Sequence, residues 1–422
     1  MNIKIRLTIL NFLEFAIWGA YLTCMSRYLI TAGLGDYISY FYSVQGFVSL
    51  FMPALMGIVA DRWIQAQKTL SLCQLIAGIA MCAAAFYGNS AGANANFGTL
   101  FGLYTLSVAF YMPTIALTNS VAYAALEGAG MDTVKAFPPI RVWGTIGFII
   151  SMLCVDWSGL QDKPWQFAVS GVLSIIMAFY ALTMPACKID KSKKTASFVD
   201  ALGLRAFTLF KQRKMAIFFI FSMLLGSSLQ ITNGYANPFI ASFGAKEAFA
   251  NTFGVQHANT LISLSQMSET LCILLIPFFL KRFGIKIVML MSMFAWVFRF
   301  GFFAIGDPGF PGVILLILSM IVYGIAFDFF NISGSLFVDQ ETDLNIRSSA
   351  QGLFMMMTNG LGASIGMLLA GQVVNYYTHG EVVNGEFYTL GNWTACWWIF
   401  SGYALVVAVL FAILFRYKHN SK

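Results

Sequence analysis

The sequence predicts an all-α protein that crosses a membrane twelve times, with its helices in two groups of six. Its 422 residues are 59% hydrophobic and only 10% charged, whereas a soluble domain carries about 25% charged residues. The apolar residues form twelve runs, each close to or longer than the ~20 residues that a helix needs to cross a bilayer. The longest polar stretch, residues 188–214, separates the sixth run from the seventh.

The apolar runs give the expected spans in order. The first six are Leu7–Thr31, Ser39–Ala60, Thr69–Tyr87, Phe97–Leu126, Pro138–Asp156 and Trp165–Met184. The second six are Met215–Phe243, Val255–Leu280, Ile285–Ile305, Gly312–Val338, Ser348–Tyr377 and Asn392–Phe415. The first run is too long for a removable signal peptide, so we expect it to remain as an anchor. We predict an N-terminal bundle over 1–187, a basic linker over 188–214 and a C-terminal bundle over 215–422.

Lysine and arginine are distributed unevenly over the predicted loops. With a cytoplasmic N-terminus, 20 of the 25 basic residues fall on the cytoplasmic side, and only Lys163 and Lys246 fall in outer loops. Cytoplasmic loops of membrane proteins carry such an excess, so we expect both termini in the cytoplasm. The net charge of +7 is then a consequence of topology, and we expect no nucleic acid partner.

Several classes of function are disfavoured because the sequence lacks the motifs that they require. The sequence has no GxxxxGK[ST] loop, which argues against transport driven directly by ATP. The seven cysteines have no metal-binding or redox spacing, and we interpret them as packing residues. No nucleophile–base pair or metal-ligand spacing indicates an enzyme. We therefore expect no enzymatic activity, no cofactor and no metal.

Three carboxylates lie inside otherwise apolar runs: Glu14, Glu269 and Asp328. A charge at the centre of a bilayer costs about 2.5 kcal/mol or more, and such residues usually face a cavity, a partner charge or a proton path. The sequence therefore predicts a protein that moves a solute across the membrane, with these three groups as candidates for coupling.

A loop between the second and third runs, Gly57-Ile-Val-Ala-Asp61-Arg62, resembles the loop signature of the major facilitator superfamily. We interpret Asp61 and Arg62 as gating-loop residues that bond helix ends. The segment Lys281–Lys286 occupies the equivalent loop of the second half. Short matches between the halves, such as Ala109-Phe110-Tyr111 with Ala326-Phe327-Asp328, suit two similar bundles around a central site.

Four longer motifs resemble bacterial nucleoside:proton symporters of that superfamily. They are Phe137–Phe148, Leu229–Asn233, Ser265–Glu269 and Tyr323–Ser335. The resemblance implies the major facilitator fold and proton-coupled import of nucleosides across the bacterial inner membrane by alternating access. We accordingly expect a nucleoside, protons and the lipid bilayer as partners of a monomeric protein. The family pattern leads us to expect Gln where this chain has Glu14, which leaves the exact substrate open.

The resemblance also supplies a candidate site. It places eight residues around the substrate: Arg141, Gln230, Asn233, Gln266, Glu269, Tyr323, Phe327 and Asp328. Helical spacing adds Thr145 and Phe148 to the face of Arg141, and Asn331 to the face of Tyr323. Amides can donate to and accept from the edges of a base, and an aromatic ring that stacks on it contributes about 1–3 kcal/mol.

We expect Asp328 to carry the coupling proton and Glu269 chiefly to bind substrate, with Glu14 as a third coupling candidate. Burial disfavours the charged form of a carboxylate, so such a group can take up a proton in one conformation and release it in another. Protonation would weaken its attraction for Arg141, which gives a route from the proton to movement of the two halves.

Each assignment has a structural alternative. Gln230 and Asn233 could only link helices, Thr145 could bond its own backbone, and Phe148 could be a packing residue. Arg141 could extend to lipid headgroups.

Glu14 could instead pair with Arg141 as a structural contact. We interpret Arg27 and Arg299 as anchors at the membrane surface. His257 could sense protons, and we interpret it as structural.

Two other transporter functions remain open. One is proton symport of another polar solute, such as a sugar or a modified nucleoside. The other is export of apolar drugs. An apolar ligand would leave the polar cluster unpaired at a cost of about 1–3 kcal/mol for each group, which makes the exporter the weaker alternative.

Overall fold

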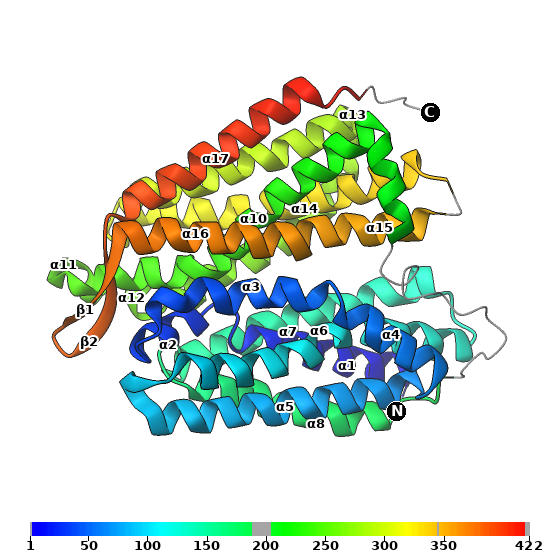
Figure 1. Ribbon diagram of the computed structural model, residues 1–422, viewed down its shortest axis with the longest axis horizontal. Helices are drawn as coiled ribbons and strands as arrows, with labels where there is room; N and C mark the ends of the chain where they lie inside the picture. Colours follow the sequence, from blue (N-terminus) through cyan, green and yellow to red (C-terminus); the bar gives the residue numbers. More distant parts are fainter. Residues whose placement is uncertain (1, 188–203, 344–345, 418–422) are drawn as a thin grey trace. The chain divides into compact units, whose positions relative to one another are not determined.

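A computed structural model describes residues 2–187, 204–343 and 346–417, and its elements are labelled in Figure 1. Most of the predicted linker, residues 188–203, lies outside the described residues. The chain divides into two compact units. The first comprises Met1–Tyr37 and Phe47–Leu202, and the second comprises Ile38–Gly46 and Gly203–Lys422.

The helices of the first part of the chain follow the predicted runs. They are α1 (Ile3–Gly19), α2 (Met25–Thr31), η1 (Gly35–Tyr37), α3 (Ile38–Ser49), α4 (Met52–Arg62), α5 (Ala66–Ala91), η2 (Gly92–Asn94), α6 (Phe97–Gly128), α7 (Thr133–Trp157) and α8 (Trp165–Leu182). Predicted starts such as Phe97 and Trp165 coincide with helix starts. The first span is split between α1 and α2, and the second between α3 and α4.

The second part of the chain is also helical, apart from one hairpin. Its elements are η3 (Leu204–Lys211), α10 (Arg213–Ser242), η4 (Phe243–Ala245), α11 (Glu247–Ala250), α12 (Phe253–Gln256), α13 (Ala258–Ile305), α14 (Gly312–Glu341), α15 (Arg347–Met355), the π-helix η5 (Met356–Gly362), α16 (Ala363–Tyr377), β1 (Thr378–Val383), β2 (Glu386–Gly391) and α17 (Trp393–Leu414).

Each of the twelve predicted spans has a helical counterpart in the described part of the chain. Nine helical segments there are long and apolar enough to cross a membrane. The first span is formed by α1 and α2, and the two halves of α13 supply the eighth and ninth. Gly284 divides α13 because its φ of 76° is non-helical and is tolerated by glycine. This break falls within the predicted loop Lys281–Lys286.

A β-hairpin, β1–β2, joins α16 to α17 where no strand was predicted. Its strands pair antiparallel with Val383 opposite Glu386, so Asn384 and Gly385 form a two-residue loop. Both have positive φ, 53° and 85°, as a type I′ turn requires. The Asn-Gly pair is the sequence signal for this hairpin.

Close packing inside the first unit is made by small residues. A Cβ atom on Gly147 of α7 would overlap the backbone of Phe12, and one on Gly19 would overlap the backbone of Phe148. Without side chains at these positions, α1 and α7 approach closely, as small residues allow in membrane helices. This approach fixes the part of α7 that carries Arg141 and Phe148.

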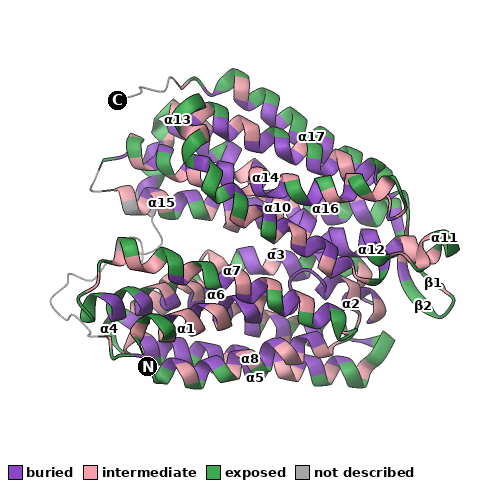
Figure 2. Ribbon diagram, turned by 180° about the vertical axis from the view of Figure 1, so that it is seen from behind, coloured by how far each residue is buried: buried purple, intermediate pink, exposed green. Residues whose placement is uncertain are grey.

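The exposed faces of the helices are apolar. Figure 2 shows exposed positions along outer helices such as α5 and α17. On α13, Leu274 and Phe278 are among the large exposed side chains, and on α17 so are Val406 and Ile413. Such faces suit contact with lipid tails, the solvent of a membrane protein.

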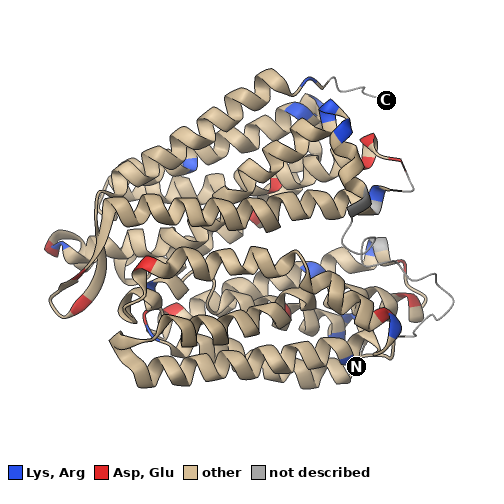
Figure 3. Cartoon of the chain, in the orientation of Figure 1, with Lys and Arg blue, Asp and Glu red and all other residues tan. Residues whose placement is uncertain are grey.

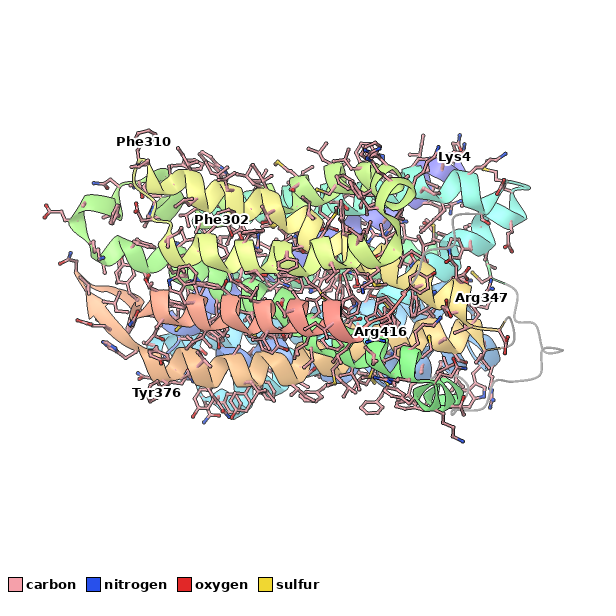
Figure 4. The ribbon with its side chains drawn as sticks, turned by 90° about the horizontal axis from the view of Figure 1, so that it is seen from above. Lys4, Phe302, Phe310, Arg347, Tyr376 and Arg416 are labelled. Carbon is pink, nitrogen blue, oxygen red and sulfur yellow. The ribbon has the colours of Figure 1, made fainter. Side chains whose placement is uncertain are left out.

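Charged residues gather near the ends of the helices, with few along their lengths (Figure 3). In the second unit, Phe310 and Tyr376 lie near one end, whereas Arg347 and Arg416 lie toward the other (Figure 4). Phe310 belongs to a predicted outer loop and Tyr376 to the outer end of the predicted eleventh span, whereas Arg347 and Arg416 belong to predicted cytoplasmic segments. The alternation of sides that the sequence predicts is therefore consistent with the geometry of this unit.

Candidate functional site

Two aromatic rings of α14 form the clearest stack among the predicted site residues. Tyr323 and Phe327 lie 5.8 Å apart between ring centroids, with an interplanar angle of 7°. Their spacing of four residues places them on one helix face, as predicted. Trp296 of α13 meets Tyr323 edge-on at 6.1 Å. Tyr323 is buried and Phe327 is half-buried.

Phe327 lines a small pocket inside the second unit. The lining comes from α10, α13, α14 and η5, and comprises Leu225, Gly226, Leu229, Trp296, Ala326, Phe327, Phe330, Asn331, Thr358 and Asn359. The predicted residue Asn331 joins Phe327 here, and its Nδ2 donates to the backbone oxygen of Phe327 at 3.2 Å. An aromatic wall with a few polar groups is typical of a small-molecule site.

Only Phe327 and Asn331 of these lining residues were predicted from the sequence, and those that it missed include Trp296, Thr358 and Asn359. The last two belong to η5, the π-helix within the eleventh span. π-Helical turns occur frequently at functional sites. The polar triplet Thr358-Asn359-Gly360 inside an apolar run was the signal that could have found them.

The amides of α10 interact with each other. Asn233 Nδ2 donates to Gln230 Oε1 at 3.2 Å, one helical turn away. This bond stays within one helix, so it does not link helices. Gln230 is 7% exposed and Asn233 is half-buried. Fixing the Gln230 oxygen as acceptor leaves its amide nitrogen to donate elsewhere.

Asp328 and Glu269, the two candidate coupling carboxylates of the second unit, lie close enough to interact electrostatically. Asp328 of α14 is 5% exposed, and its Oδ2 atom is buried and accepts no hydrogen bond from the described residues. Glu269 of α13 is half-buried. Gln266, one turn earlier, lies within hydrogen-bonding reach of the Tyr323 hydroxyl. The structure therefore brings Gln266, Glu269, Tyr323 and Asp328 within interaction range of one another.

Arg299 corrects one expectation. We interpreted it as an anchor at the membrane surface, but its side chain is 2% exposed. Its guanidinium donates to the Ser319 oxygen at 2.6 Å and lies 4.7 Å from the Tyr323 ring centroid. Arg299 turns inward because its partners on α14 attract it. Hydropathy is calculated along one segment, so it cannot show partners that another helix supplies.

In the first unit, Glu14 is fully buried. Its carboxylate accepts hydrogen bonds from three side chains: Thr114 at 2.6 Å, Gln74 at 3.0 Å and Thr118 at 3.0 Å. Arg141 exerts an attraction on it. The attraction between Glu14 and Arg141, which we named as a structural alternative, therefore belongs to a polar cluster that also involves α5 and α6.

The predicted residues of α7 lie beside α1. The guanidinium of Arg141 stacks over the Phe15 ring at 3.9 Å from its centroid. Phe148 is 7% exposed and meets Trp18 edge-on at 6.3 Å, which is the packing contact that we named as its alternative. Thr145 is half-buried, one turn from Arg141.

The remaining candidates lie at helix ends. Asp61 and Arg62 are exposed and are the last two residues of α4. The positive charge of Arg62 in the last turn interacts favourably with the helix dipole. His257 precedes α13, 5.1 Å from the Phe253 ring, and Arg27 lies on α2. Among the described residues, no group of three or more His, Cys, Asp or Glu side chains could hold a metal ion.

Comparison with known proteins identifies the family. The family model described as nucleoside H⁺ symporter matches residues 1–420. The chain belongs to this family. It is 47% identical to the xanthosine permease of Escherichia coli K12 over 423 residues, which cover 100% of this chain and 97% of that protein. It is also 47% identical to the nucleoside permease NupG of the same strain over 421 residues, 99% of this chain and 97% of that protein.

Solved structures agree with this assignment. A crystal structure of the nucleoside transporter NupG matches the symporter with a TM-score of 0.89 at 47% identity, and covers 99% of this chain and 100% of that one. The inward-open xylose transporter XylE of E. coli matches with a TM-score of 0.67 at 13% identity, over 99% and 97% of the two chains. The second likeness shows the fold alone. The symporter is a multi-pass membrane transporter of the major facilitator fold, not an enzyme.

Proposed function

We propose that this symporter imports nucleosides together with protons across the bacterial inner membrane by alternating access. The observation that carries the proposal is the stacked pair Tyr323–Phe327 beside amide and carboxylate groups, in a chain that the symporter family matches over residues 1–420. A nucleoside offers a flat base with amide-like edges and a sugar with hydroxyls. Stacking rings and amides are complementary to the base.

We assign the following residues to substrate contact: Arg141, Thr145, Phe148, Gln230, Asn233, Gln266, Glu269, Tyr323, Phe327 and Asn331. The pocket adds Asn359 as a further amide at the surface that Phe327 lines. Glu269 would accept hydrogen bonds from ribose hydroxyls. Asp61 and Arg62 would act in a gating loop at the end of α4.

We assign the coupling proton to Asp328. Its buried Oδ2 has no hydrogen-bond donor among the described residues, and a negative charge on Glu269 acts on it. A buried, repelled and poorly solvated carboxylate is costly when charged, and a proton removes that cost. Glu269 and Glu14 remain the other coupling candidates.

Family membership and the distribution of charge support a proposal for the arrangement in the cell. We propose a monomer with both termini in the cytoplasm. Bundles over 1–187 and 215–422 would be joined by the basic linker 188–214, whose eight basic residues favour the cytoplasmic side.

The test is uptake into proteoliposomes with an imposed pH gradient. Radiolabelled uridine and adenosine should accumulate when the outside is more acidic, and a protonophore should abolish the accumulation. A labelled sugar such as xylose tests the other polar solute, and a lipophilic dye tests drug export. Accumulation of the sugar but of no nucleoside would overturn the proposal.

A further inference from the structure

The cluster around Glu14 is a buried polar network that four helices build inside the first unit. Glu14 comes from α1, Gln74 from α5, Thr114 and Thr118 from α6, and Ser174 from α8. All five are nearly or fully buried. Oε1 of Glu14 accepts from Thr114, and Oε2 accepts from Gln74 and Thr118. The charged carboxylate therefore has three donors.

Ser174 fixes the orientation of Gln74. The Ser174 hydroxyl lies 2.5 Å from Gln74 Oε1, so the amide oxygen points toward α8 and the nitrogen toward Glu14. The same Nε2 also donates to Thr114 Oγ1 at 3.0 Å. Both of its hydrogens are thereby used. A flipped amide would place its oxygen against the carboxylate, which is repulsive.

Thr114 has two acceptors within reach of its hydroxyl. Its Oγ1 lies 2.6 Å from Glu14 Oε1 and 2.5 Å from the backbone oxygen of Tyr111. A hydroxyl carries one hydrogen and two lone pairs, and a threonine in a helix commonly donates to the carbonyl three residues earlier. The single hydrogen can serve either oxygen, but not both at full strength.

At these distances, the Glu14 carboxyl group can form hydrogen bonds in both its charged and its protonated state. When Glu14 is charged, Thr114 donates to Oε1. When Oε1 carries a proton, it donates to Thr114 Oγ1, and the Thr114 hydrogen turns to the Tyr111 carbonyl. The second lone pair of Oγ1 still accepts from Gln74. One proton is added, and the heavy atoms keep their positions.

We propose that Glu14 is a proton-binding site of the first unit, distinct from the carboxylates of the second unit, with Thr114 as the hydroxyl that satisfies both states. Its role in transport rests on the proposed proton coupling, but proton binding by itself does not. The carboxyl replaces the amide that the family pattern leads us to expect at this position, and an amide cannot take up a proton in this way.

The groups that face Glu14 would sense its charge. Arg141 from α7 attracts it, and the hydroxyl of Tyr111 and the thiol of Cys73 face it from α6 and α5. On α8, the group nearest to this network is the neutral Ser174, which contacts Glu14 only indirectly, through its hydrogen bond to Gln74. Neutralising Glu14 would remove an attraction on Arg141, which we have assigned to substrate contact. Proton occupancy of Glu14 would thus alter the charge balance at Arg141.

Infrared difference spectroscopy on the purified full chain tests proton binding directly. An acid-minus-neutral spectrum should contain the C=O stretching band of a protonated carboxylic acid that the Glu14→Gln variant lacks. If the spectra of parent and variant contain the same carboxylic acid bands, Glu14 does not titrate and the proposal is overturned. This measurement needs neither nucleoside nor transport.

Thr114 is tested by conservative variants. Thr114→Val removes the acceptor and should displace the Glu14 band or change the pH at which it appears, whereas Thr114→Ser should keep the parent behaviour. The matched control is Ser107→Ala, because Ser107 is a buried hydroxyl of the same helix that bonds the Ala77 oxygen at 2.9 Å instead. A band unchanged by Thr114→Val would overturn the role of Thr114. These variants also carry the test if Glu14→Gln fails to fold.

The transport arm measures the proton-to-nucleoside ratio from zero-flux gradients in proteoliposomes. Glu14→Gln should lower this ratio by the one proton that it can no longer carry. An unchanged ratio, with the infrared band lost as expected, would leave Glu14 a proton site that is not coupled. Absence of nucleoside uptake by the parent would instead contradict the proposed function and leave the infrared result standing.

Discussion

The guanidinium of Arg299 lies 4.7 Å from the centroid of the Tyr323 ring, inside the second unit. Tyr323 in turn stacks on Phe327 at the pocket. Arg299 also donates to the Ser319 oxygen and to Ser265 Oγ, and the Ser319 hydroxyl donates back to the Arg299 oxygen at 2.9 Å. These bonds fix the guanidinium, so the cation–π contact holds the Tyr323 ring in place.

We expect Arg299→Met to weaken nucleoside binding by about 2- to 30-fold, the range that corresponds to a cation–π contribution of about 0.5–2 kcal/mol. Arg299→Lys should fall between parent and Met variant, because it retains the charge and loses the planar fork. Calorimetric titration on folded protein measures both affinities.

A double-mutant cycle separates positioning from general stability. In a Tyr323→Leu background, Arg299→Met should have little further effect on affinity, because the ring that it positions is gone. Equal losses in both backgrounds would show that Arg299 acts elsewhere.

The amides give a second prediction. Gln230→Ala, Asn233→Ala and Gln266→Ala should each weaken nucleoside binding by about 5- to 150-fold, since each removes hydrogen bonds of about 1–3 kcal/mol to a buried polar ligand. Gln340→Ala is the matched control, an exposed amide near the end of α14 that bonds Tyr417. Unchanged affinity in all three variants would remove these amides from the site.

Asp328→Asn mimics the protonated carboxyl permanently. It should abolish accumulation of nucleoside driven by a pH gradient, while some exchange of nucleoside down its own gradient persists. The control is Asp339→Asn on the same helix, where the exposed carboxylate pairs with Arg347 at 3.2 Å. If the Asp328 variant still concentrates nucleoside as well as the parent, the coupling group is Glu269 or Glu14.

The proposed orientation in the membrane is tested by labelling single introduced cysteines in a variant from which the native cysteines have been removed. With Lys163→Cys and Lys191→Cys, a membrane-impermeant reagent applied to intact cells should label the first and reach the second only after permeabilisation. The motivation is the excess of basic residues in the predicted cytoplasmic loops. Labelling of both from outside would exclude the proposed topology.

Apolar run length was sufficient to predict most of the fold. A segment inside a membrane must satisfy its backbone hydrogen bonds internally. An uninterrupted apolar run such as Phe97–Leu126 is therefore expected to form a helix, and α6 does begin at Phe97. Run length does not reveal where a span is interrupted. The π-helix η5 and the split between α1 and α2 are seen only in the three-dimensional structure.

The candidate site also contains residues that the sequence could predict and residues that it could not. Helical spacing on one span predicts correctly that Tyr323 and Phe327 share a face, because the period of the helix is fixed by its backbone. Spacing carries no information about a neighbouring span, and so it could not indicate that Thr358 and Asn359 line the same pocket as Phe327.

The sequence by itself determined that this is a helical multi-pass membrane protein with twelve apolar runs, that it resembles nucleoside:proton symporters, and which three carboxylates lie within those runs. Only the tertiary structure decided what those carboxylates meet. Glu14 has three hydrogen-bond donors, whereas Asp328 has a buried oxygen without a donor among the described residues. The reason is physical: hydropathy is a property of one segment, but the stability of a buried charge depends on side chains that other helices bring to it.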